Sequence, residues 1–458
     1  MMRGSSRADG VPLRSSLILV SVVFAALAFR LVRLTERYAV NIFFWDQWDI
    51  NDATLFQYHS LWEIFRWQHG PHRQGLGGLL AILVEPWFDW NSRTEAFLAT
   101  GLVVIAALCA LYLKYRLFGS LSWTDLVIPI IILSPAQWDS LWTTVNLSHG
   151  VLPLLLVILY CLVWTWRHER AKFALITVLN FLILYTGFGL FIGFLTPVLL
   201  IATYRGGHNK TAAAKTYLVF CMIASVVSMA SFFVGYRSDP SSGCSSLFSP
   251  SPVQYFWFMD LMYAHPFGVR GIGLIPRFTG AIVFASVAAV AVAGWKQVFG
   301  NSGGHRALNL VPAVLSTYSI LFCVSAALGR TCIGLFAAHA SRYSNYMQLG
   351  ILSLYLCALA VGRSRLAMAL STVLLISLLP SLVVSPSDTR GMRMFSSRKA
   401  AWRTCYLGGH DIADCDRAFG AVHPLPDTTH LKEKLDYLQA TEQNLFSDSR
   451  RDDWPGRP

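Results

Sequence analysis

Apolar runs recur along most of the chain and are separated by short polar segments. A membrane-spanning helix needs about 20 mainly apolar residues, so these runs predict an all-α polytopic membrane protein with about eleven transmembrane helices. The expected spans are Ser16–Leu34, Glu95–Leu113, Thr124–Ala136, Leu147–Trp166, Ala171–Thr186, Gly189–Tyr204, Thr216–Tyr236, Arg277–Ala293, Leu308–Leu328, Tyr343–Val361 and Leu366–Val384.

Basic residues set the expected orientation, since lysine and arginine gather in cytoplasmic loops. Clusters follow the second, fourth, sixth, eighth and tenth spans, and three arginines precede the first, so the N-terminus is expected in the cytoplasm. The apolar run Gly75–Trp90 contains Glu85, Pro86 and Asp89, and we expect it to lie along the membrane surface. With eleven crossings the C-terminus is then periplasmic.

The polar segments divide the chain into two parts. Residues 1–384 are expected to form one membrane domain with a long first outer loop, from about 35 to 93, and residues 385–458 a polar C-terminal tail. The first apolar run is followed by Arg30 and Arg33 rather than by a small-residue cleavage site, which indicates a retained signal anchor.

Composition supports a membrane protein and excludes some partners. Hydrophobic residues make up 54% and charged residues 14% of the chain, whereas about a quarter of a soluble domain is charged. The net charge of +12 is explained by the cytoplasmic loops, so we do not expect nucleic acid as a partner. No CxxC pair is present, and Cys405 and Cys415 can form a disulfide if the tail faces an oxidising compartment.

The first outer loop gathers titratable residues in an otherwise apolar chain. Asp46 and Asp49 are one helical turn apart, and "QHGPHRQGL" places His69, His72 and Arg73 at the start of the next apolar run. A carboxylate can take a proton from a hydroxyl, and arginine and histidine can hold a phosphate. The combination indicates transfer from a membrane-bound phosphate ester.

Two other polar segments are expected on the same side. Arg330 and Arg342 end two spans and are expected to reach the phosphate of the donor. "PAQWDSLWTTVNLSHG" contributes Asn146 and His149, beside Gln137 and Asp139, as candidates for a sugar pocket.

The order of these features resembles the GT-C superfamily of membrane glycosyltransferases, in particular protein mannosyltransferases and aminoarabinose transferases. Their first outer loop carries an aspartate, followed by a stretch like "HPPLG" and a span ending in "ARRLFG"; "QHGPHRQGLGGLL" and "LKYRLFG" are similar. The His-Pro-Pro core is not intact here, and the acids are spaced Asp-x-x-Asp. The resemblance covers about the first 120 residues.

The resemblance implies a bacterial inner-membrane enzyme that moves a hexosyl or pentosyl group, with inversion, from a polyprenyl-phosphate carrier to a lipid, glycan or protein hydroxyl. It implies Asp46 as the general base, with Asp49 as its close competitor. We assign no metal ligands, but a divalent cation such as Mg²⁺ or Mn²⁺ stays open because two carboxylates three residues apart can help to bind one.

Three other classes of protein share parts of this pattern. A transporter or flippase for lipid-linked glycans would carry paired charges in mid-membrane and inverted repeats. An O-antigen polymerase or ligase would place its large loop late in the chain. A non-catalytic scaffold would not need the acids of the first loop.

Overall fold

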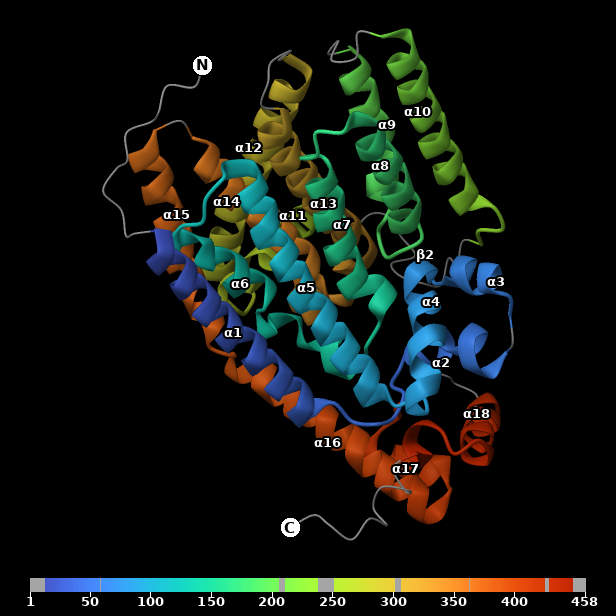
Figure 1. The fold of residues 1–458 in the computed structure, drawn as a ribbon. Coiled ribbons are helices and arrows are strands. Elements are labelled where there is room, and N and C mark those ends of the chain that lie inside the picture. The colour runs from blue at the N-terminus through green and yellow to red at the C-terminus, as the bar shows by residue number, and fades with distance from the viewer. Residues whose placement is uncertain are drawn as a thin grey trace.

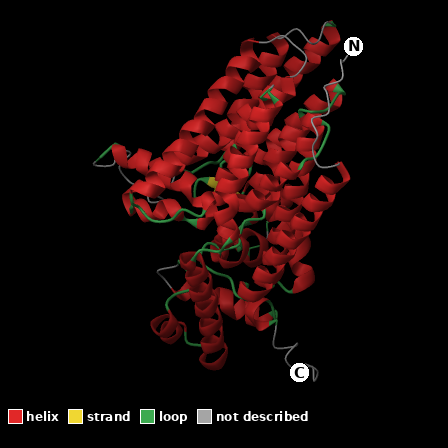
Figure 2. Ribbon diagram, turned by 90° about the vertical axis from the view of Figure 1, so that its left-hand side faces the viewer, coloured by secondary structure: helices red, strands yellow, loops and turns green. Residues whose placement is uncertain are grey.

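The computed structural model describes residues 13–57, 59–205, 211–237, 251–300, 306–361, 363–424 and 428–447. Almost all of this part of the chain is helical (Figure 2). Within the described residues, six helices are long and apolar enough to cross a membrane. They are α1 (Leu13–Tyr38), α5 (Ser92–Phe118), α10 (Ala212–Phe233), α12 (Leu274–Gly300), α13 (Arg306–Arg330) and α15 (Ser364–Leu378) with its continuation to Leu382.

Shorter helices complete the bundle. They are α4 (Gly75–Val84), α6 (Val127–Ile132), α7 (Leu152–Val163), α8 (Glu169–Leu184), α9 (Leu190–Arg205), α11 (Val253–Ala264) and α14 (Ser344–Ala360). All but one of the eleven expected spans coincide with a helix, so the expectation of an all-α membrane protein is confirmed. The count of eleven crossings stays a prediction, because six helices in the described part of the chain meet the criterion of length and hydropathy.

The exception is the expected span Thr124–Ala136. The structure divides it into the turn Trp123–Leu126, the six-residue α6 and the turn Pro135–Gln137. A proline inside a helix removes a hydrogen bond and clashes with the preceding turn, and Pro135 stands directly after Ser134, where the helix has ended. The sequence analysis also did not predict α11, which packs against α12 and α13.

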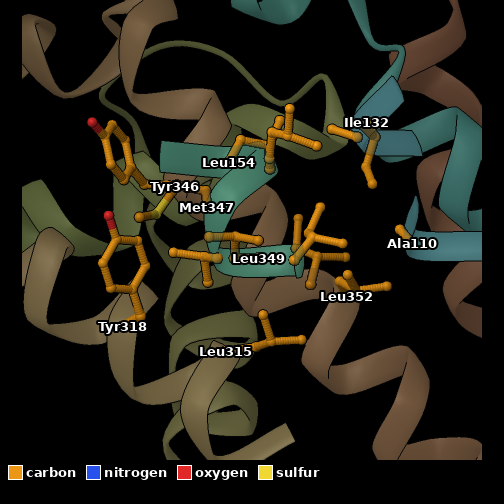
Figure 3. Close-up of a cluster of buried hydrophobic side chains, with 14 of the residues drawn as sticks. Ala110, Ile132, Leu154, Leu315, Tyr318, Tyr346, Met347, Leu349 and Leu352 are labelled. Carbon is orange, nitrogen blue, oxygen red and sulfur yellow. The ribbon is translucent and has the colours of Figure 1, made fainter. Parts of the chain in front are cut away.

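Aliphatic and aromatic side chains from α5, α6, α7, α13 and α14 form the centre of the bundle. Figure 3 shows Ala110, Ile132, Leu154, Leu315 and Leu352 interdigitating there, and all five are almost fully buried. Tyr318 and Tyr346 lie at one edge of this cluster (Figure 3). Their hydroxyls donate to backbone carbonyls, so the core is tied to the polar site described below.

One end of the bundle carries a polar helical layer (Figure 1). The first loop contributes α2 (Gln47–Ile50), α3 (Leu61–Arg66) and the antiparallel strand pair β1 (Gln68–His69) and β2 (His72–Arg73). The C-terminal segment contributes α16 (Pro386–Gly409), α17 (Ile412–Phe419) and α18 (Thr428–Ala440). Helix α4 has ten residues and therefore rises about 15 Å, half of a hydrocarbon core.

The first loop and the C-terminal segment share a hydrophobic core of their own. Phe43 and Trp48 from the loop are buried together with Trp402, Leu435 and Leu445 from the C-terminal helices. A disulfide joins Cys405 of α16 to Cys415 of α17. The polar tail is therefore a folded helical lobe that packs on the first loop.

At the opposite end of α5, the segment "LKYRLFG" contains the lysine of a buried ion pair. The Nζ of Lys114 lies 2.8 Å from Oδ2 of Asp125, and both side chains are almost completely buried. Asp125 also accepts hydrogen bonds from the backbone N–H of Ser122 and from the hydroxyl of Tyr355, and Lys114 donates to the carbonyl of Ser120. Every charge in this pair has protein partners, which is typical of a structural site.

Candidate functional site

Asp46 is positioned by the buried residues on either side of it. Phe44 and Trp48 are buried, and Gln47 accepts from the N–H of Phe44 at 3.0 Å and donates to Oε2 of Glu95 at 2.8 Å. This fixes the start of α2 to the start of α5. The side chain of Asp46 stays 44% exposed, so "FWDQWD" anchors the loop through Phe44, Gln47 and Trp48 while it presents an acid.

A tight hairpin brings His69 to this acid. Gly70 at the tip has φ +54°, a conformation that glycine adopts without strain, and His69 pairs with His72 across the two strands. Nε2 of His69 lies 3.8 Å from Oδ2 of Asp46. The break that Gly70 and Pro71 were expected to make is therefore a turn that aims a histidine at Asp46.

The hairpin packs closely on a second polar segment. The ring of His72 lies 4.6 Å from that of His149 and 4.5 Å from that of Phe188. A Cβ on Gly187 would lie 2.8 Å from Cα of His149, so only glycine fits there. Burial, helped by the charges of His69 and Arg330, lowers the pKa of His72 to about 3, and this histidine is neutral at physiological pH.

Two arginines from distant parts of the chain act on Asp46. Arg330 ends α13, and Arg342 lies in the turn Ser341–Tyr343 that precedes α14; both side chains are solvent-exposed. The contact with His69 is the main reason why the pKa of Asp46 is lowered; burial opposes it, and the charges of His69, Arg342 and Arg330 add to it. Asp46 is therefore ionised at neutral pH and faces cations.

Among the acids whose charge raises the pKa of Arg342, Asp139 has the largest effect. Its backbone N–H donates to the hydroxyl of Ser341 at 3.0 Å, which ties the turn after α6 to the turn that carries Arg342. Burial raises the pKa of Asp139, and the charge of Arg342 partly offsets this. Asp49 behaves similarly, because burial raises its pKa and Lys434 opposes the rise.

Other expected site residues make structural contacts. The guanidinium of Arg73 donates to the carbonyls of Arg66, Phe232 and Val234 at 2.6–2.9 Å and lies over the ring of Phe232. Arg73 thereby supplies hydrogen-bond donors to carbonyls at the C-terminal end of α10. The side chain of Asn146 accepts from the N–H of His149 at 3.1 Å, so Asn146 caps the turn that presents this histidine.

Lys399 joins the C-terminal lobe to the site, although nothing in the sequence singled it out. It is 1% exposed, and its Nζ donates to the carbonyl of Thr143 at 3.1 Å. Burial lowers its pKa to about 7, while Glu95 and Asp139 act in the opposite direction. The contact joins positions 256 residues apart, and the only sequence signal is a lysine inside an otherwise ordinary polar helix.

Apart from Asp49, whose side chain is half-buried, the expected set divides into two groups. Asp46, His69, His72, His149, Arg330 and Arg342 are brought to one region at the polar end of the bundle. Arg73 and Asn146 support the backbone around it. Among the described residues, no group of three or more histidines, cysteines or acids is arranged to hold a metal ion.

Comparisons with known proteins add no relative to this picture. No protein-family model matches the sequence, and no curated protein matches it.

Proposed function

We propose that this protein is a membrane glycosyltransferase of the GT-C type. It moves a sugar from a polyprenyl-phosphate carrier to a hydroxyl of a lipid, glycan or protein at the outer face of the bacterial inner membrane. The observation that carries the proposal is an ionised carboxylate, Asp46, at the polar end of a membrane bundle, which lies 3.8 Å from His69 and whose pKa the charges of two exposed arginines help to lower.

In the proposed reaction Asp46 takes the proton of the acceptor hydroxyl. The acceptor oxygen attacks the anomeric carbon, and the bond from this carbon to the phosphate oxygen breaks with inversion. Its electron pair leaves with polyprenyl phosphate, whose negative charge Arg330 and Arg342 stabilise. His72 donates a hydrogen bond to the phosphate of the donor, and His149 donates one to the sugar. We now assign Arg73 to positioning, because its guanidinium already donates to three backbone carbonyls.

Three disulfide-bonded cysteines support an outward-facing site. Cys405 and Cys415 are joined in the C-terminal lobe, and Cys332, two residues after Arg330, is also disulfide-bonded. The free cysteines of the described chain lie within helices of the bundle. Since disulfides persist in oxidising compartments, the proposal places this end and the C-terminus in the periplasm and the N-terminus in the cytoplasm.

Release of polyprenyl phosphate is the direct test. Purified protein in liposomes is given a panel of polyprenyl-phosphate sugars and candidate acceptors, with and without EDTA, so that dependence on a divalent cation is read separately. We expect Asp46→Asn to lower the rate of release by a factor of roughly 10² to 10⁴ at an unchanged melting temperature. Asp49→Asn is the matched control, and we expect it to retain most of the activity.

The results separate this function from its main alternative. Release at the wild-type rate by the Asp46→Asn, Asp49→Asn double variant would exclude the proposed base. Movement of the intact lipid-linked sugar across the bilayer, without release of polyprenyl phosphate, would identify a transporter instead.

A further inference from the structure

The last turns of α1 carry three arginines on one face. Arg30, Arg33 and Arg37 are spaced three and four residues apart, so they follow one another along the helix surface. Together with Leu34 and Glu36 they line a groove of about 420 Å³. Glu36 pairs with Arg33, which leaves the groove with a net positive charge.

These arginines lie within a candidate membrane span. The apolar segment of α1 runs from Ser15 to Tyr38, so Arg30 lies about 12 Å and Arg37 about 1.5 Å along the helix axis from its end. The headgroup region on each side of a bilayer is about 5–7.5 Å thick, so the three arginines extend from this region to a few ångströms below its boundary with the acyl chains. Ionisable residues inside a span usually face a partner, yet Arg30 has no acidic partner among the residues that the structure describes.

Helix α16 carries a second basic groove. It contacts α1, and the two helices run along the same edge of the molecule in Figure 1. Arg390 and Arg393 are exposed there and line a groove of about 660 Å³ that also includes Met394. Basic and apolar side chains that alternate on one exposed surface are typical of a helix lying at a membrane interface.

We propose that the edge formed by α1 and α16 binds the phosphate headgroup of an acidic membrane lipid. Arginine recognises phosphate oxygens through two parallel N–H donors, and five arginines line the two grooves. The occupant is a lipid rather than a soluble anion because α1 also exposes Val22, Phe29 and Val32, which cover acyl chains. This inference does not depend on the proposed glycosyl transfer.

Lipid binding by the purified full-length protein in nonionic detergent tests the proposal. Native mass spectrometry measures the affinity for phosphatidylglycerol, with phosphatidylcholine as the neutral lipid and inorganic phosphate as the soluble anion. Each arginine near a headgroup contributes roughly fivefold in affinity. We therefore expect Arg30→Gln, Arg33→Gln, Arg37→Gln to weaken phosphatidylglycerol binding more than tenfold, and Arg390→Gln, Arg393→Gln to weaken it about tenfold or more.

The matched control changes two exposed arginines elsewhere on the protein. Arg363→Gln, Arg365→Gln at the start of α15 should leave the affinity unchanged. Equal binding of phosphatidylglycerol and phosphatidylcholine, wild-type affinity in both test variants, or displacement by inorganic phosphate at equal concentration would overturn the proposal. If the α1 variant does not fold, the α16 variant decides, because its changes lie outside the spans.

Discussion

Two charged regions at opposite ends of the bundle differ in how completely the protein satisfies them. Lys114 and Asp125 are buried and 2.8 Å apart; Lys114 also donates to the carbonyl of Ser120, and Asp125 accepts from Ser122 and Tyr355. Asp46 is 44% exposed, and its Oδ2 lies 3.8 Å from Nε2 of His69. A buried ion pair whose charged atoms all have protein partners holds helices together. An exposed charged group that can accept further hydrogen bonds is available to a ligand.

The largest expected effect concerns the buried ion pair of Lys114 and Asp125. Lys114→Ala leaves a carboxylate buried without its cation, which costs about 3–5 kcal/mol of stability, and we expect a large fall in melting temperature. Asp46→Asn should change the melting temperature little. A Lys114→Met, Asp125→Leu variant should recover most of the loss; a single Lys114→Ala variant as stable as the wild type would remove the contrast between the two regions.

A second prediction compares two arginines that the sequence did not distinguish. Arg330→Gln should lower the rate of polyprenyl phosphate release by a factor of roughly 10 to 100 without a change in melting temperature, because its side chain is exposed. Arg73→Gln should instead lower the stability by about 2 kcal/mol, since it leaves buried carbonyls without a donor. The opposite assignment of the two effects would mean that Arg73, and not Arg330, serves the site.

The smallest expected effect, for a change of one pH unit, is the pH dependence of the C-terminal lobe. Burial lowers the pKa of Lys399 to about 7 from its usual 10.5, while Glu95 and Asp139 oppose the shift. Between these values the unfolded chain binds the proton that the folded chain has lost, so this group makes stability rise with pH, by at most about 1.4 kcal/mol per unit.

Melting temperatures from pH 7 to 9 test this sign. The rise should be present in the wild type and reduced in Lys399→Met, with Lys432→Met as the control because this lysine lies on the surface of α18. An identical pH profile for Lys399→Met and the wild type would show that Lys399 is not buried as a neutral amine.

The helices were largely predictable from the sequence, and the site only in part. Runs of apolar residues located the six described helices that are long and apolar enough to cross a membrane, because each must satisfy its own backbone in a lipid environment. They did not locate the 24-residue α16 in the polar C-terminal segment. The break in Thr124–Ala136 escaped this reasoning, since α6 is buried by neighbouring helices rather than by lipid. Asp46, His69 and His72 were recognised because they stand close together in an otherwise apolar chain.

What the sequence by itself determined is the class of protein and the acidic loop: hydrophobic length and the scarcity of charge are local properties that can be read along the chain. Only the tertiary structure decided which charges meet. In the folded chain the charges of Arg330 and Arg342 act on Asp46. Arg73 instead binds carbonyls at the end of α10, and the charge of Glu95 acts on the buried Lys399. Electrostatic interactions depend on distance in space and on burial, and neither can be read from spacing along a chain of 458 residues.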